Sequence, residues 1–223
     1  MKTAVISLGG SLIAPKKIDI NFLKKFKKLI LGFTEKDHRF VIICGGGRLA
    51  RDLQEIGKKL KLGNEILDWI GIYATRINAN VLRSVFRGFA EENIITDPVK
   101  KIKSGKKVII CAGWKPGWST DYDAVLLAKS FKTDTIVNMT NIDYVYSKDP
   151  KKYKNAKPVR EISWKDFRKL GGNKWKPGLN RPFDPIAAKE AEKSNLKVIV
   201  IGNDLGNLKN LLSNKQFKGT IIR

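Results

Sequence analysis

The chain has 223 residues, of which 42% are hydrophobic and 29% charged, so it can bury the core of one α/β domain and has no signature of disorder. No stretch approaches the roughly 18 consecutive apolar residues of a membrane span, and the first residues lead into a strand, so we expect a cytoplasmic protein. The formal net charge of +23 favours the capture of anions, whether nucleotides or nucleic acid, without choosing between them.

Side chains that form disulfides or bind metals are few. Cys44 and Cys111 each end an apolar run, which predicts buried free thiols in a reducing compartment. The one histidine, His38, lies in a charged loop, so a zinc site is not expected. The lysines are spread along most predicted helices, which favours solvated faces over a nucleic-acid-binding surface.

Two glycine turns follow the first two predicted strands. The first strand spans 2–8 and ends at Gly9-Gly10-Ser11, and the second spans 40–44 and ends at Gly45-Gly46-Gly47, before a helix predicted over 48–62. Glycines let backbone N–H groups approach an anion, and the positive end of the helix points at the same place, which predicts a phosphate-binding cradle. Because ligands gather beyond the carboxyl ends of parallel strands, both turns are expected at one crevice if their strands are neighbours.

Two arginines open the helix after the second turn. Arg48 and Arg51 are three residues apart, so both guanidinium groups can lie on one face and grip a phosphate. The alternative is a tight turn with two solvated arginines. We favour the phosphate-binding cradle, because a tight turn needs only one glycine and this segment has three.

The next two helices differ in what they carry. Asp19 is predicted to cap a structural helix with an apolar stripe that includes Phe22 and Phe26. The helix predicted over 65–85 keeps a period near 3.6 and carries Asp68. Asp68 either accepts sugar hydroxyls or forms a hydrogen bond near the helix start, and the sequence rates the two evenly.

The loop 112–121 has an unusual composition, with two glycines, a proline, Trp114 and Trp118. Three of its residues can cap the helix predicted over 122–131, namely Ser119, Thr120 and Asp121. The loop is therefore either a capping cluster or the wall of a ligand site. The flat apolar faces of the indoles favour the wall.

The remaining elements alternate between strands and helices. Further strands are predicted at 94–96, 107–111, 135–139, 197–201 and, at an edge of the sheet, 219–222. Helices are predicted at 164–170 and from Asp184-Pro185 to Glu192. The polar segment 148–157 is expected at the surface, and 171–182, anchored by Trp175, is predicted to be a mobile lid. The alternation predicts an α/β domain with a mostly parallel sheet covered by helices on both sides.

The glycine turns, arginines and acidic residues suit phosphoryl transfer, in which positioning and charge neutralisation supply most of the catalysis. The chain has no Gly-x-x-x-x-Gly-Lys-Ser/Thr motif, which excludes a P-loop enzyme. It also has no Gly-x-Gly-x-x-Gly after either strand, which weakens a dehydrogenase interpretation.

The order of these motifs resembles the amino acid kinase superfamily, and within it the UMP kinases of the archaeal type, over nearly the whole chain. Six blocks carry the resemblance: 8–11 and 45–51 at the nucleotide turns, 68–79 beside UMP, 116–121 on the uracil side, 140–150 on the adenine side and 184–189 in the late catalytic stretch. The resemblance implies a three-layer αβα sandwich around a mostly parallel central sheet, formed by one domain over 1–223. The N-terminal part would bind mainly the phosphoryl acceptor, and roughly 135–223 mainly ATP.

The same resemblance implies ATP-dependent phosphorylation of UMP to UDP with Mg²⁺, by a homo-oligomer, a hexamer, with no membrane or nucleic-acid partner. Catalysis would fall to Arg51, Asp184 and Arg48. The residues implied at ATP are Ser7, Leu8, Gly9, Gly10, Ser11, Gly46, Arg51, Thr140, Asn141, Tyr146 and Asp149. Those implied at UMP are Gly45, Asp68, Gly113, Trp114, Lys115, Pro116, Gly117, Trp118, Ser119, Thr120 and Asp121.

Two positions depart from the family pattern. Many relatives carry a catalytic lysine where Ser7 stands, and Tyr144 replaces a glycine usual in the adenine-side motif. The missing cation is expected from one of five residues, namely Lys16, Arg48, Arg51, Lys174 and Lys176. The rival hypotheses are another acceptor in the same fold (a carboxylate, carbamate or isoprenoid phosphate), a nucleotide-binding sensor without turnover, and a nucleic-acid-binding protein.

Overall fold

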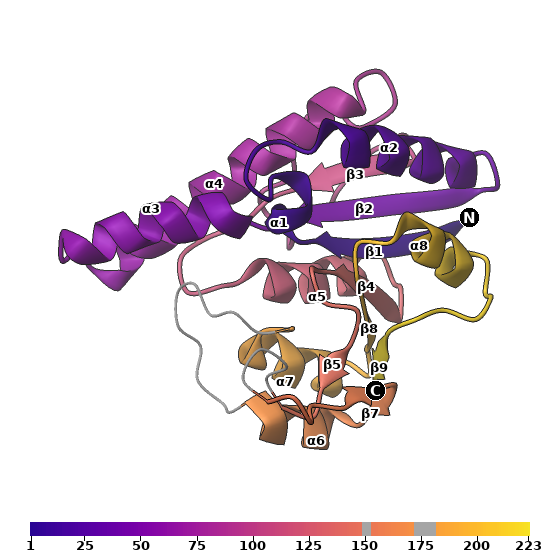
Figure 1. Ribbon diagram of the computed structural model, residues 1–223. Helices are drawn as coiled ribbons and strands as arrows, with labels where there is room; N and C mark the ends of the chain where they lie inside the picture. Colours follow the sequence, from indigo (N-terminus) through magenta and orange to yellow (C-terminus); the bar gives the residue numbers. More distant parts are fainter. Residues whose placement is uncertain (149–152, 172–181) are drawn as a thin grey trace.

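A seven-stranded sheet forms the middle layer of the computed structural model, which describes residues 1–148, 153–171 and 182–223 (Figure 1). The strand order is β3-β2-β1-β4-β8-β9-β7. The strands are β1 (Lys2–Leu8), β2 (His38–Cys44), β3 (Val108–Cys111), β4 (Thr135–Met139), β7 (Glu161–Ile162), β8 (Lys197–Ile201) and β9 (Thr220–Ile222). All neighbours from β3 to β8 in this order are parallel. A separate antiparallel pair joins β5 (Val145–Tyr146) to β6 (Pro158–Val159).

Helices cover both faces of the sheet, with α2 and α4 on one side and α5 and α7 on the other (Figure 1). The helices are α1 (Gly10–Ile13), α2 (Ile20–Thr34), α3 (Gly47–Lys59), α4 (Asn64–Val85), α5 (Thr120–Ser130), α6 (Trp164–Gly171), α7 (Pro185–Lys193) and α8 (Leu205–Leu212). The predicted αβα sandwich around a mostly parallel sheet is confirmed. None of the helices in the described part of the chain is long and apolar enough to cross a membrane.

Successive residues of the central strand β1 belong to different cores, which explains its apolar run Ala4-Val5-Ile6 and the apolar Leu8 at its end. Ile6 and Leu8 pack in the core under α2, α4 and α8, whereas Val5 packs in the core under α5 and α7. All three side chains are fully buried. A strand covered on both faces is mostly apolar, because neither face meets water, and the buried hydroxyl of Ser7 is satisfied by its hydrogen bond to Asp121.

Two predicted strands differ in the structure. Residues 94–96 form no regular strand, and Ile95 makes only an isolated parallel bridge with Cys111. The C-terminal strand is not at the edge, since β9 pairs antiparallel with β8 and parallel with β7. Strand β7 was not predicted, because its two residues are too few to show a period of two.

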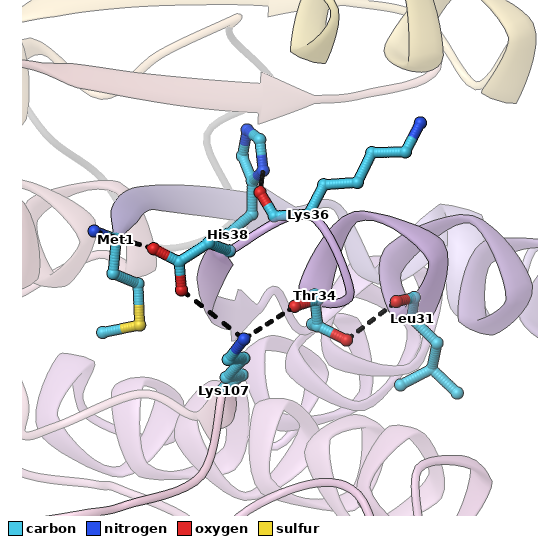
Figure 2. A network of polar contacts seen from close by, with 7 residues as sticks. Met1, Leu31, Thr34, Lys36, His38 and Lys107 are labelled. Atoms are coloured by element: carbon cyan, nitrogen blue, oxygen red, sulfur yellow. Dashed lines mark hydrogen bonds and ion pairs between the residues drawn. The ribbon is translucent and has the colours of Figure 1, made fainter.

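A polar network ties the amino ends of the first three strands together (Figure 2). The amino group of Met1 pairs with Asp37 at 3.0 Å, and the Lys107 ammonium lies 3.5 Å from the same carboxylate and donates to the Thr34 carbonyl at 2.9 Å. His38 starts β2 beside this network, so it lies at the opposite end of the strand from the second glycine turn.

Both cysteines are buried free thiols, as predicted. Loss of hydration raises the pKa of Cys44 and Cys111 above the ordinary thiol value, so both are protonated and unreactive at neutral pH.

Candidate active site

The two glycine turns lie against each other at the carboxyl ends of β1 and β2, as predicted. The Gly45 N–H donates to the Leu8 carbonyl at 2.9 Å, across neighbouring parallel strands. A Cβ atom on Gly10 would lie 2.3 Å from the Gly45 oxygen, and one on Gly47, whose φ is +63°, would lie 2.4 Å from the Gly10 carbonyl carbon. Only residues without a side chain allow this backbone-to-backbone contact.

Asn78 of α4 holds the second turn in place. Its side-chain amide donates to the carbonyl oxygens of Gly45 at 2.8 Å and Gly46 at 3.1 Å, and the residue is 3% exposed. With both carbonyls tied back to α4, the turn is fixed beside the start of α3. The sequence showed Asn78 only as a polar residue in a helical pattern, because nothing local links it to a turn more than thirty residues away.

The two arginines of α3 separate in the structure. The Arg51 guanidinium donates to the Ser11 hydroxyl at 3.1 Å and so spans from the second turn to the first. Arg48 instead pairs with Asp52 at 3.1 Å, one helical turn further along the exposed face. The structure therefore brings Arg51, and not Arg48, to the point where the two turns meet.

The loop predicted to hold the acceptor is tied to α4 at three backbone groups. The N–H of Gly113 donates to the Thr75 hydroxyl at 2.8 Å, and that of Gly117 donates to Asp68 at 2.8 Å. The Trp114 carbonyl accepts from Arg76 at 3.3 Å. Asp68 is thus already bonded within the protein through one oxygen, while loss of hydration raises its pKa against the opposing effect of the Gly117 N–H.

Aromatic rings lie at the end of this loop. The Trp118 ring stacks on Tyr122 at a centroid distance of 4.1 Å, and the Lys115 ammonium lies 4.0 Å from the centroid of Trp114. Pro116 lies between these two groups in the chain. Ser119 is the residue that caps α5, since its hydroxyl accepts from the Tyr122 N–H at 3.2 Å. The capping alternative is therefore correct for Ser119. That Trp114 and Trp118 form the wall of a ligand site stays a prediction.

Asp121 connects three elements beneath the turns. It accepts from the Ser7 hydroxyl at 3.2 Å and from the Asp184 N–H at 3.0 Å. Loss of hydration and then the neighbouring Asp184 charge raise the pKa of Asp121 to about 7, although both hydrogen bonds oppose the rise. One oxygen of Asp184 accepts from the N–H groups of Ile186 and Ala187 and so caps α7. Thr120, the first residue of α5, immediately precedes Asp121.

The adenine-side segment begins beside the first glycine turn. The Gly9 N–H donates to the carbonyl of Met139, the last residue of β4, and Thr140 and Asn141 follow directly. The rings of Tyr144 and Tyr146 meet edge to face at a centroid distance of 6.5 Å. The prediction for Asp149 lies outside the described residues, as do those for Lys174, Lys176 and Trp175 and most of the predicted lid.

Strand order arranges these parts in a line along one edge of the sheet. The tryptophan loop, which is the predicted acceptor loop 112–121, follows β3, and the triple glycine follows β2. The first glycine turn follows β1, and the adenine-side segment follows β4. Because neighbouring strands are about 4.8 Å apart, the line from the tryptophan loop to Thr140 is about 14 Å long before the loops extend it. An acceptor, a chain of phosphates and a base can occupy it in that order.

The donor set for a metal at this edge is small. Across the described residues, no group of three or more acidic, histidine or cysteine side chains is placed to hold an ion.

Comparisons with known proteins agree with this geometry. The sequence profile of the amino acid kinase family matches residues 2–202. The chain therefore belongs to the amino acid kinase family.

Several relatives of high coverage are uridylate kinases. The chain is 38% identical over 218 residues to a uridylate kinase of Thermoplasma volcanium, which spans 96% of this chain and 94% of that protein. It is 34% identical over 201 residues to a uridylate kinase of Pyrococcus abyssi, with 89% of each chain covered. The crystal structure of a uridylate kinase from Archaeoglobus fulgidus matches with a TM-score of 0.83 at 30% identity, over 100% of both chains.

Proposed function

We propose that this protein is a UMP kinase, which transfers the γ-phosphoryl group of ATP to UMP and so makes UDP and ADP for pyrimidine nucleotide synthesis. The observation that carries the proposal is the contact between the two glycine turns, which supports two phosphate-bearing ligands meeting end to end. The uridylate kinase relatives, aligned over nearly the whole chain, support UMP as the acceptor.

The proposed chemistry needs no strong general base. The nucleophile is an oxygen of the UMP phosphate, which is already ionised near neutral pH, so no proton has to be removed from it. Charge on the moving phosphoryl group must be neutralised instead. Arg51 is proposed to do this, because its guanidinium already reaches from the second turn to Ser11 in the first. Magnesium would neutralise further phosphate charge when it is bound with ATP.

Ser7 cannot supply the positive charge that many relatives carry at this position, so the charge is assigned to Arg51. The Ser7 side chain is buried and donates to Asp121, so it serves the contact between β1 and α5 and carries no charge. Arg51 lies on the helix that follows the second turn and donates to Ser11 of the first, whereas Arg48 is engaged with Asp52. We propose that the N-terminal part of the chain binds mainly UMP and that roughly 135–223 bind mainly ATP.

A coupled assay of ADP release over a panel of acceptors tests the function. The panel contains UMP, CMP, AMP, acetate, carbamate and isopentenyl phosphate, each with ATP and Mg²⁺. UMP is expected to give the highest kcat/KM. Preference for another acceptor would favour the same fold with a different substrate, and tight binding of ATP and UMP without ADP release would identify a sensor.

We also propose that the protein forms a homo-oligomer through α3 and α4, which pack together and project from the sheet (Figure 1). Apolar side chains at helical spacing remain exposed on α3 (Leu53 and Ile56), at its C-cap (Leu60) and on α4 (Ile66, Tyr73 and Ile77). Substitution Ile56→Glu is expected to shift the sedimentation coefficient to that of a smaller species. An unchanged coefficient would place the interface elsewhere.

A further inference from the structure

Asp123 of α5 is a buried carboxyl group that the chemistry above does not use. Its side chain is 0% exposed, and it follows the Ser119-capped start of the helix. One oxygen, Oδ2, accepts from the Trp114 N–H at 3.1 Å, whereas Oδ1 is buried with no hydrogen-bond partner among the described residues. Burying a carboxyl group with one oxygen unsatisfied is unfavourable, so a merely structural position would be better filled by an apolar residue.

The hydrogen bond between Asp123 and the Trp114 N–H holds the predicted acceptor loop, 112–121, from α5, whereas its other contacts come from α4. Three side chains of α4 hold the loop at Gly113, at the Trp114 carbonyl and at Gly117. Asp123 holds it from α5 at the Trp114 N–H. The peptide groups on both sides of Trp114 are therefore held, one by each helix, which fixes the backbone that carries the indole.

The surroundings of Asp123 contain acidic groups and a thiol. Asp121 lies on the same helix, Asp97 faces it from the segment before β3, and Cys111 faces it from the end of β3. No ion pair among the described residues involves Asp123. Burial, followed by the charges of Asp121 and Asp97, raises the pKa of Asp123 to about 8, with the Trp114 N–H opposing the rise. The group therefore acts as a neutral hydrogen-bond acceptor near pH 7.

We propose that Asp123 is a positioning residue for the acceptor nucleotide, which it orients by fixing the backbone of Trp114 in the acceptor loop. The proposal rests on the proposed UMP kinase function and extends it to a residue outside the predicted binding set. Asp123 does not touch the substrate, because both of its oxygens are buried behind the loop.

Two substitutions of similar size separate this role from a structural one. Asp123→Asn keeps an oxygen for the Trp114 N–H, whereas Asp123→Val removes the acceptor and fills the same space. Asp123→Val is expected to raise the KM for UMP about tenfold, the effect of one lost hydrogen bond to a buried group, with the KM for ATP unchanged. Asp123→Asn is expected to restore the KM for UMP to within about threefold of wild type. Asp134→Val, at the opposite end of the sheet, is the control and should change neither KM.

Hydrogen–deuterium exchange tests the loop contact without any assumption about the substrate. Exchange of the peptide that contains Trp114 should accelerate in Asp123→Val and stay near wild type in Asp123→Asn and Asp134→Val. Equal KM values for UMP in the two Asp123 variants, or a parallel rise of both nucleotide KM values, would overturn the proposal. Unchanged exchange in Asp123→Val would also overturn it. If the wild type phosphorylates no UMP but the exchange pattern holds, the proposed function fails while the loop contact stands.

Discussion

The contact between the glycine turns can be tested by adding a single methyl group. In Gly10→Ala the new Cβ would lie 2.3 Å from the Gly45 oxygen, 2.6 Å from the Gly47 nitrogen and 2.7 Å from the Asn78 amide nitrogen. Two of these atoms are backbone, so the turns must move apart by about 1 Å to reach ordinary van der Waals contact. Overpacking of this kind destabilises a fold by about 1–3 kcal/mol. Misplacement of reacting groups by about 1 Å reduces rates by about a hundredfold.

We therefore expect kcat/KM for UMP phosphorylation to fall about a hundredfold in Gly10→Ala, measured by ADP release at saturating ATP. The melting temperature should fall by several degrees, at about 2–4 °C per kcal/mol for a chain of this size. Gly32→Ala is the matched control, because its Cβ meets nothing within 4 Å and it lies inside α2. That variant should keep full activity and gain about 0.5–1 kcal/mol. Wild-type activity in Gly10→Ala, or an equal loss in both variants, would refute the reasoning.

Three further predictions concern charge and support around the turns. Arg51→Ala should lower kcat about a hundredfold or more, because charge neutralisation is lost. Arg48→Ala loses only an exposed ion pair and should keep kcat within about twofold of wild type. Equal effects of the two substitutions in steady-state kinetics would contradict this. Asn78→Ala should lower kcat/KM and the melting temperature together, because it frees the Gly45–Gly46 carbonyls, and unchanged activity would count against it. The pKa values of Asp121 and Asp123, about 7 and about 8, exceed the usual carboxyl value, so the folded state keeps protons that the unfolded state releases. Stability to urea should thus fall as pH rises, from about 4 to 7 for Asp121 and from about 4 to 8 for Asp123, by about 1 kcal/mol per pH unit for each group. Asp123→Asn should reduce this slope, and a flat profile for the wild type would contradict the assignment.

Much of the fold follows from local sequence patterns. The strands buried on both faces appear as uninterrupted apolar runs such as 40–44, and the capping residues Asp19 and Asp184 occur where the helices begin. Paired strands of two residues, such as β7, carry no periodicity and could not be predicted. The failure at 94–96 arose because apolar composition alone does not distinguish a strand from an extended segment with one bridge.

The candidate site was predictable where its parts are continuous in sequence. Glycine clusters after strands indicated the two turns, and the tryptophan loop stood out by composition. Asn78, Thr75 and Asp123 could not be found in this way, because each acts on a backbone group of a segment brought near only by tertiary packing. The different contacts of Arg48 and Arg51 likewise depend on the Asp52 carboxylate, which lies one helical turn from Arg48 and binds it. Helical spacing alone does not predict which of the two arginines makes this ion pair.

A crystal structure with UMP and a non-hydrolysable ATP analogue tests the central claim most directly. We predict that the two nucleotides lie end to end along the carboxyl edge of the sheet, with the UMP base beside the tryptophan loop and the adenine beyond Thr140. The γ-phosphate should lie between Gly10 and Gly45, within hydrogen-bond distance of Arg51. Phosphates bound on opposite sides of the turns, or an Arg51 side chain directed away from both nucleotides, would contradict the account.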